Sequence, residues 1–267
     1  MLNDVAPAVR AKAATEFAAE FGSEALCPRE RAVAAKVLEV FAADVAREVR
    51  EAVAEQVKNS LFLPRNIALK LANDVDSVAI PILRCTCTLT DDDLISIVRG
   101  GSEAKGVAIA SREMVSEALS SALLKTGRRS VATIVLANKG AAVGADDLGW
   151  VLDQHVDDRE IQALLVSRPK LPPAVMERLV AAASEELRAK LLARGDVPAA
   201  LASHIVDLGR DNALAAQLRT AKTEEDLGAA VARMAAESRL TPIFVMRVLV
   251  SGDIGVFEHA IAELARI

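Results

Sequence analysis

Three arginines recur at equivalent positions of an internal repeat and are the side chains best placed to bind a ligand. Arg112, Arg168 and Arg194 each follow a short helical pattern, in a column completed by Thr86, Asn138 and Thr220. A row of guanidinium groups can bind carboxylates or phosphates through paired hydrogen bonds. An arginine just after a helix can instead donate to the last unpaired carbonyls, where the helix dipole also favours it. We favour this structural role and keep the binding role as the alternative.

Two other groups contain residue types that bind metals. Acidic runs at residues 91–93, 146–147 and 224–226 stand where helices are expected to begin. Carboxylates in a first turn complement the helix dipole, and consecutive residues point in different directions, so they converge poorly on one ion. Cys85 and Cys87 lack the second ligand pair of a structural zinc site, since Cys27 is the only other cysteine. We expect no metal and no cofactor.

Signatures of catalysis are missing from the sequence. Residues 99–102, Arg-Gly-Gly-Ser, lack the strand context and spacing of a phosphate-binding loop and predict a helix C-cap. No G-x-S-x-G nucleophile motif occurs, and no converging pair of carboxylates can be chosen from the sequence. We expect a protein that is not an enzyme and has no catalytic residues.

A repeat of about 26 residues organises most of the chain. Leu63, Leu89 and Val115 are 26 residues apart, as are Leu171 and Val197. The fourth unit, from Val143, aligns only with short insertions. The second position of each unit is a residue that commonly starts helices: Pro64, Thr90, Ser116, Gly144, Pro172 and Pro198. Two further columns are almost wholly aliphatic: Leu71, Ile97, Leu123, Val151, Leu179, Ile205; and Leu83, Ile109, Val135, Leu165, Leu191, Gln217.

Each unit therefore predicts a first helix, a short link, a second helix and a turn. Such helices are too short to be stable alone, but stacked units bury a continuous apolar core. We predict an all-α protein, a right-handed α-solenoid of HEAT-like helix pairs. Its parts are an N-terminal helical hairpin (residues 1–62), six repeats (63–222) and a C-terminal helical cap (223–267), in which Thr223 and Asp226 begin a capped helix.

The N-terminal hairpin is expected to hold a helix near residues 7–21 and a long helix over residues 28–58, which contains no internal glycine or proline after Pro28. Valines recur along the long helix, among them Val37, Val45, Val49 and Val53. We favour packing of this helix within the chain. The alternative is a homodimer interface formed by these valines.

Four segments carry a resemblance to a known family: LPRNIALKLANDVDSVAIPIL, LTDDDLISIVRGGS, AIASREMVS and LTPIFVMRVLVSGDIGVFEHAIAELA. They resemble an alphaproteobacterial family defined as domain of unknown function 2336. The turn SRPKLPPAVMERL also resembles leucine-rich-variant and HEAT-like helical repeats. The family resemblance covers about three quarters of the chain. It implies a bacterial, cytoplasmic protein and brings no activity with it.

Composition narrows the class of partner. The chain has 267 residues, a net charge of −5 and 3% aromatic residues. The acidic balance makes nucleic acid an unlikely partner, because nucleic-acid-binding domains usually carry a basic surface. Three cysteines do not suggest a disulfide framework, and no signal peptide or membrane span is expected.

These observations together favour a scaffold or adaptor that binds a protein or peptide on the solenoid surface. The expected contact residues are exposed polar positions of the first helices: Asp92, Ser96, Arg99, Glu117, Ser121, Asp147, Gln154, Glu177 and Arg178. One alternative is nucleic-acid binding by the arginine column. Another is a sensor of a small signalling ligand, with a pocket between the N-terminal helices and the first repeat.

Overall fold

The structure is a computed structural model that describes residues 6–22, 26–169, 171–182, 185–219, 223–236, 240–250 and 252–265. These residues form seventeen α-helices and no strand, so the predicted all-α class is confirmed. The chain divides into two compact units, Met1–Ala182 (unit 1) and Ala183–Ile267 (unit 2). Among the residues described, no helix has both the length and the apolar character needed to cross a bilayer.

Unit 1 begins with helices α1 (Pro7–Phe21), α2 (Pro28–Phe41) and α3 (Arg47–Val57). The prediction of one long helix over residues 28–58 is therefore wrong. At the break, the Asp44 carboxylate accepts the backbone N–H of Ala46 at 2.8 Å and two N–H groups of Arg10 at 2.9 and 2.8 Å. A short acidic side chain that bonds a nearby backbone N–H competes with the helical hydrogen-bond pattern. The Arg10 guanidinium holds the pKa of Asp44 below its ordinary value.

Helix pairs follow in the predicted positions. They are α4 (Arg65–Ala72) with α5 (Asp76–Cys85), α6 (Asp91–Gly100) with α7 (Glu103–Ala110), α8 (Glu117–Leu124) with α9 (Arg129–Ala137), and α10 (Ala145–Gln154) with α11 (Arg159–Ser167). Helix α12 (Pro173–Ala182) ends unit 1. The second position of each repeat precedes its first helix, and the Thr90 and Ser116 side chains accept backbone N–H groups there. Local capping therefore sets where the repeats start.

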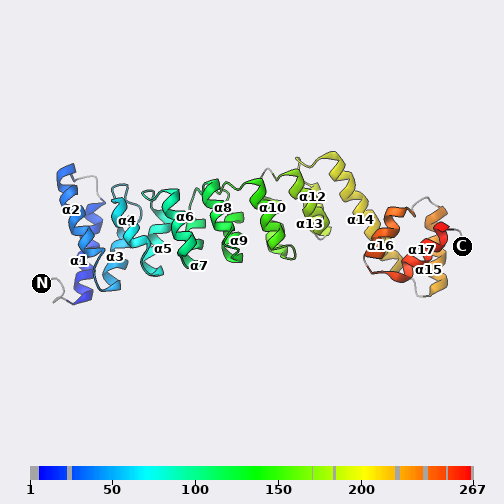
Figure 1. The fold of residues 1–267 in the computed structure, drawn as a ribbon, viewed down its shortest axis with the longest axis horizontal. Helices are drawn as coiled ribbons and strands as arrows, with labels where there is room; N and C mark the ends of the chain where they lie inside the picture. Colours follow the sequence, from blue (N-terminus) through cyan, green and yellow to red (C-terminus); the bar gives the residue numbers. More distant parts are fainter. Residues whose placement is uncertain are drawn as a thin grey trace. The chain divides into compact units, whose positions relative to one another are not determined.

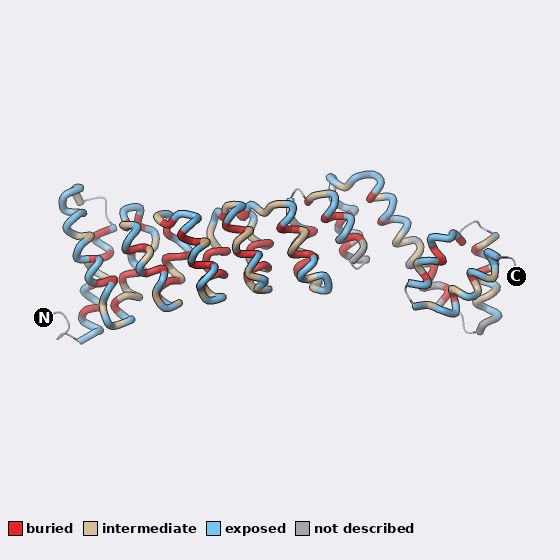
Figure 2. The backbone as a smooth tube through the Cα atoms, viewed as in Figure 1, coloured by how far each residue is buried: buried red, intermediate tan, exposed pale blue. Residues whose placement is uncertain are grey.

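Successive pairs of unit 1 stack in two rows of helices (Figure 1). One row runs α3, α5, α7, α9, α11 and the other runs α6, α8, α10, α12, with each helix contacting the next of its row. Both predicted aliphatic columns are buried where the helices meet (Figure 2). The exception is Gln217, whose side chain lies outside the described residues.

Unit 2 contains α13 (Glu185–Leu192), α14 (Ala199–Arg219), α15 (Glu224–Ala236), α16 (Pro242–Val250) and α17 (Ile254–Ala265). The sixth repeat was expected to form a helix pair, but α14 is one continuous helix. Asp211, in the middle of this helix, pairs with Arg247 of α16. The predicted cap of α15 is confirmed, since Asp226 donates its N–H to the Thr223 hydroxyl at 3.1 Å.

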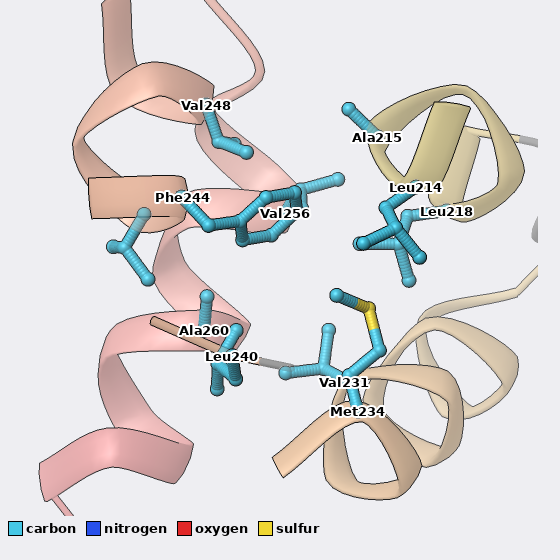
Figure 3. Packing of buried hydrophobic residues seen from close by; sticks show 11 residues of the cluster. Leu214, Ala215, Leu218, Val231, Met234, Leu240, Phe244, Val248, Val256 and Ala260 are labelled. Carbon is cyan, nitrogen blue, oxygen red and sulfur yellow. The ribbon is translucent and has the colours of Figure 1, made fainter. Parts of the chain in front are cut away.

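Four helices of unit 2 enclose a single apolar core (Figure 3). Leu214 and Leu218 come from α14, Val231 and Met234 from α15, Phe244 and Val248 from α16, and Val256 and Ala260 from α17. Figure 3 shows these side chains converging from all four helices. Because Phe244 is completely buried, one face of α16 is held firmly in this core.

Candidate functional site

Arg112 and Arg168, two members of the arginine column, bind backbone carbonyls of the preceding repeat. The Arg112 guanidinium donates to the carbonyls of Leu83 and Thr86, both at 2.7 Å, at the end of α5. Arg168 donates to the carbonyls of Leu136 at 3.1 Å and Ala141 at 2.5 Å, around the end of α9. Burial lowers the pKa of both guanidinium groups.

Asn138, the column residue between them, continues the same pattern. Its side-chain amide donates to the carbonyls of Ala110 at 2.8 Å and Arg112 at 2.7 Å, and its oxygen accepts the N–H of Gly140 at 2.9 Å. We call Arg112, Asn138 and Arg168 the carbonyl ladder. It gives the terminal carbonyls of α5, α7 and α9 a charged or amide donor from the next repeat. The favoured structural role therefore applies, with the refinement that each donor acts on the repeat before its own.

Arg194 and Thr220 differ from these three. Arg194 lies in unit 2 and pairs with Asp196 at 2.8 and 2.7 Å, within its own turn. Thr220 lies outside the described residues. The three arginines consequently do not present one continuous set of donors towards a ligand.

The predicted contact residues Asp92, Arg99, Glu117 and Arg178 are all exposed on first helices of unit 1. Arg178 of α12 forms an ion pair with Asp153 of α10. Their exposure is compatible with binding.

Two carboxylates of the acidic runs, Asp93 and Asp147, are buried. Asp93 pairs with Arg65 of the preceding first helix at 2.9 and 2.5 Å, and this pairing lowers the pKa of Asp93 to about 2. Asp147 accepts a hydrogen bond from the hydroxyl of Ser121 at 3.0 Å. These carboxylates join neighbouring repeats, so the acidic runs act in the stack as well as in helix capping.

No group of three or more metal-ligating side chains occurs in the part of the chain that the structure describes. Cys27, Cys85 and Cys87 are free and exposed. Gly101 is the C-cap of α6, as predicted for the glycine-rich segment.

The four valines of the hypothetical dimer interface do not share one face. Val49 and Val53 are completely buried on α3, which packs against α1 and α5. Val37 and Val45 are exposed, on α2 and in the turn that follows it. Packing within the chain therefore accounts for Val49 and Val53.

An apolar groove in unit 2 was not foreseen from the sequence. It has a volume of about 520 Å³ and is lined by Pro242, Ile243, Met246 and Val250 of α16, Leu208 of α14, and two arginines, Arg188 and Arg247. We call it the α16 groove. Ile243, Met246 and Val250 are 63%, 59% and 86% exposed, although all three are large apolar side chains.

The composition of α16 explains this surface. Its sequence, PIFVMRVLV, contains a single charged residue, Arg247. Phe244, Val245 and Val248 face the core of unit 2, which leaves the opposite apolar face in solvent. A helix that is apolar on all sides is expected to be buried on all sides. The absence of a polar face was the signal in the sequence that could have identified this site.

Charge at the groove comes from its two arginines. Arg247 pairs with Asp211 of α14, which orients the guanidinium beside the apolar lining. Arg188 of α13 is half-buried at the groove. A ligand there would meet apolar side chains next to two guanidinium groups, of which that of Arg247 is paired with Asp211.

Residues 78–267 match the model of a family described as an uncharacterised protein conserved in bacteria, DUF2336. No curated protein and no solved structure matches the chain.

Proposed function

We propose that this chain, which belongs to the bacterial family DUF2336, is a non-catalytic interaction scaffold that binds a protein partner in the α16 groove. The observation that carries the proposal is the exposed apolar face of α16. Soluble proteins rarely expose contiguous apolar patches, and larger ones commonly mark interaction sites.

The architecture of unit 1 supports the same class of function. We interpret its stacked helix pairs as a right-handed α-solenoid of HEAT-like repeats. Solenoids generate extended surfaces for macromolecular partners because each repeat contacts only its neighbours. In this interpretation unit 1 supplies a rigid framework, with the carbonyl ladder fixing each pair to the one before it.

The chemistry of the groove indicates the kind of partner. Amphipathic helices bind apolar grooves through side chains spaced three, four and seven residues apart. Arg188 and Arg247 favour a helix that also carries carboxylates beside its apolar stripe. We therefore expect the partner to contribute an acidic amphipathic helix.

Binding of nucleic acid by the arginine column gains no support, because the donors of Arg112 and Arg168 point at carbonyls of the preceding repeat. A groove of about 520 Å³ is also within the size range of small-molecule sites. The arrangement of exposed residues along one helix face nevertheless favours a helical ligand.

The proposal is tested by affinity capture from a lysate of the native bacterium, with three baits. The first is wild type, the second Met246→Asp, and the third the matched control Met114→Asp. Met114 is 74% exposed, belongs to unit 1 and is not one of the groove residues, which all belong to unit 2. A carboxylate at Met246 would stand inside the apolar lining, so a partner that uses the groove should be lost.

A protein retained by wild type and by Met114→Asp, lost from Met246→Asp, and carrying an acidic amphipathic helix is the expected result. A synthetic peptide of that helix should bind the purified protein, and more weakly as salt rises. Identical eluates from all three baits, or retention by Met246→Asp, would contradict the proposal. Circular dichroism before capture establishes that the three baits are equally folded.

A further inference from the structure

Helix α2 presents a second uncovered apolar stripe, in unit 1. Val33, Val37 and Val40 are 61%, 39% and 55% exposed and lie four and three residues apart, on one helix face. The other side of α2 packs against the rest of unit 1. Leu38 and Phe41 are buried, and the centroid of the Phe41 ring lies 6.0 Å from that of Phe17 on α1. The stripe is thus a surface left over after the helix has packed.

Two opposite charges border the stripe on the same side. Lys36 and Glu39 are exposed, and neither makes an ion pair with another described residue. At 100° per residue, both lie to one flank of Val33, Val37 and Val40. When two copies are related by a twofold axis, the positive group of one copy can therefore lie next to the negative group of the other.

We propose that α2 is a self-association surface, on which the α2 helices of two copies of this chain pack antiparallel about a twofold axis. In a twofold interface the same patch meets itself. With the axis between Lys36 and Val37, Val33 of one copy faces Val40 of the other, and the two Val37 side chains meet near the axis. This inference is independent of the α16 groove.

The charges fit this register. At a rise of 1.5 Å per residue, Lys36 of one copy and Glu39 of the other are about 3 Å apart along the helix axes. Two symmetrical ion pairs can therefore form, one on each side of the axis. A parallel arrangement would separate these groups onto opposite flanks.

The neighbouring surface offers space for the partner helix. A groove of about 400 Å³ is lined by both apolar and charged residues: Lys36, Glu39, Val40, Phe41, Ala43, Asp44, Val45 and Lys70. Since Val33 of the second copy faces Val40, its side chain would lie beside this groove. Three valines on each helix make a small interface, so we expect a dissociation constant on the order of 10 µM.

Sedimentation equilibrium of the full chain, from about 1 to 200 µM, is the first measurement. Wild type is expected to shift from monomer to dimer over this range, and Val37→Asp to stay monomeric throughout. Met114→Asp, at an exposed site of the same unit, serves as the matched control and should dimerise like wild type. A monomeric wild type at 200 µM would overturn the inference.

A charge exchange then tests the register. Lys36→Glu and Glu39→Lys each place like charges at two symmetrical positions, and each should weaken the dimer about tenfold at low salt. The double variant, Lys36→Glu with Glu39→Lys, restores opposite charges and should return to within about twofold of wild type. A double variant as weak as either single variant would contradict the antiparallel pairing.

Met246→Asp separates self-association through α2 from self-association through the α16 groove. It is expected to leave the dimer intact. If it abolished dimerisation while Val37→Asp did not, the inference about α2 would be wrong, and a second copy of the chain would be the occupant of the α16 groove.

Discussion

The helix pairs of residues 63–182 and unit 2 differ in how completely they bury their large apolar side chains. Among the described residues, large exposed apolar side chains of the helix pairs are few: Val75, Met114 and Val156. Unit 2 exposes three times as many: Leu192, Val206, Ile243, Met246, Leu249, Val250, Ile254, Ile261 and Leu264. The pairs bury their apolar faces against neighbouring pairs, whereas unit 2 encloses one small core and leaves apolar surface over.

The two regions also differ in which elements their polar contacts join. Between the pairs, side chains bond groups of the neighbouring repeat. The carbonyl ladder donates to carbonyls of the preceding repeat, and Arg65 donates to the Asp93 carboxylate of the following one. In unit 2 the Asp211–Arg247 pair joins α14 to α16 within the same four-helix arrangement. Repetition therefore gives the apolar faces of the helix pairs neighbours within the chain, whereas unit 2 leaves more large apolar side chains exposed.

The largest expected effect is on the core of unit 2. Phe244→Ala should lower the free energy of unfolding of that unit by about 3–5 kcal/mol, because it removes a fully buried ring and leaves a cavity. Urea unfolding is followed by circular dichroism, which reports both units, and by fluorescence of Trp150, the only tryptophan, which lies in unit 1.

The matched control is Ile243→Ala, on the exposed face of the same helix, which should change the free energy of unfolding by less than about 0.5 kcal/mol. An equal loss in both variants would show that the exposed face is buried in solution, and the contrast between the two faces of α16 would disappear.

The next largest expected effect is the loss of stability when a residue of the carbonyl ladder is replaced. Arg112→Ala should destabilise unit 1 by about 2 kcal/mol, since the carbonyls of Leu83 and Thr86 lose charged donors. Arg112→Lys should recover less than half of this loss, because one ammonium cannot reproduce the two-pronged guanidinium. Trp150 fluorescence in urea measures both changes.

Arg99→Ala is the control, since Arg99 is exposed near the end of α6. It should cost less than about 0.5 kcal/mol. If Arg112→Ala were equally mild, the ladder would contribute little to the stack, and Arg112 would again be a candidate for ligand binding.

A smaller, purely steric effect is expected when the two neighbouring glycines Gly101 and Gly100 are each replaced by alanine. A Cβ at Gly101 would lie 2.5 Å from the carbonyl oxygen of Ile97, whereas a Cβ at Gly100 would meet no atom within 4 Å. Gly101→Ala should therefore cost about 1–2 kcal/mol, and Gly100→Ala should be neutral or slightly stabilising. Thermal unfolding compares the two, and equal melting temperatures would contradict the tight turn between α6 and α7.

The smallest expected effect is a pH dependence of the folding stability, caused by an ion pair between two neighbouring repeats. The pKa of Asp93 in the folded chain is about 2, below its ordinary value of 3.8, chiefly because Arg65 donates to the carboxylate. The stability from this pair is present in full above pH 3.8 and is lost as the pH falls towards 2. The difference in unfolding midpoint between wild type and Asp93→Asn should thus shrink as the pH is lowered.

Asp92→Asn changes the adjacent exposed carboxylate and controls for the loss of one negative charge. It should alter the midpoint less than Asp93→Asn at neutral pH. A constant difference between wild type and Asp93→Asn from pH 5 to pH 2 would show that the ion pair with Arg65 does not contribute to the stack.

Features that depend on local chemistry could be predicted. The capping residues Thr90 and Ser116 placed helix starts correctly, and the aliphatic columns identified the buried face of each pair. Features that depend on a competing tertiary contact could not. Asp44 breaks the expected long helix while it pairs with Arg10, 34 residues away, and α14 runs through the link expected in the sixth repeat.

The candidate site was less predictable than the fold. Exposed polar residues such as Asp92 and Arg99 were expected on the surface, and that is where they lie. The direction of the Arg112 and Arg168 side chains, towards carbonyls of the preceding repeat, depended on how closely the turns stack. The α16 groove was missed because an apolar helix is usually assigned to the core.

By itself, the sequence determined the helical class, the 26-residue period and the buried positions of each repeat, since these follow from local propensity and apolar spacing. Only the tertiary structure decided which side chains join neighbouring repeats, where the stack of pairs gives way to a separate unit, and which face of α16 stays in solvent. Those outcomes depend on contacts between residues far apart in the chain, and the apolar pattern of one helix does not specify which neighbour will cover it.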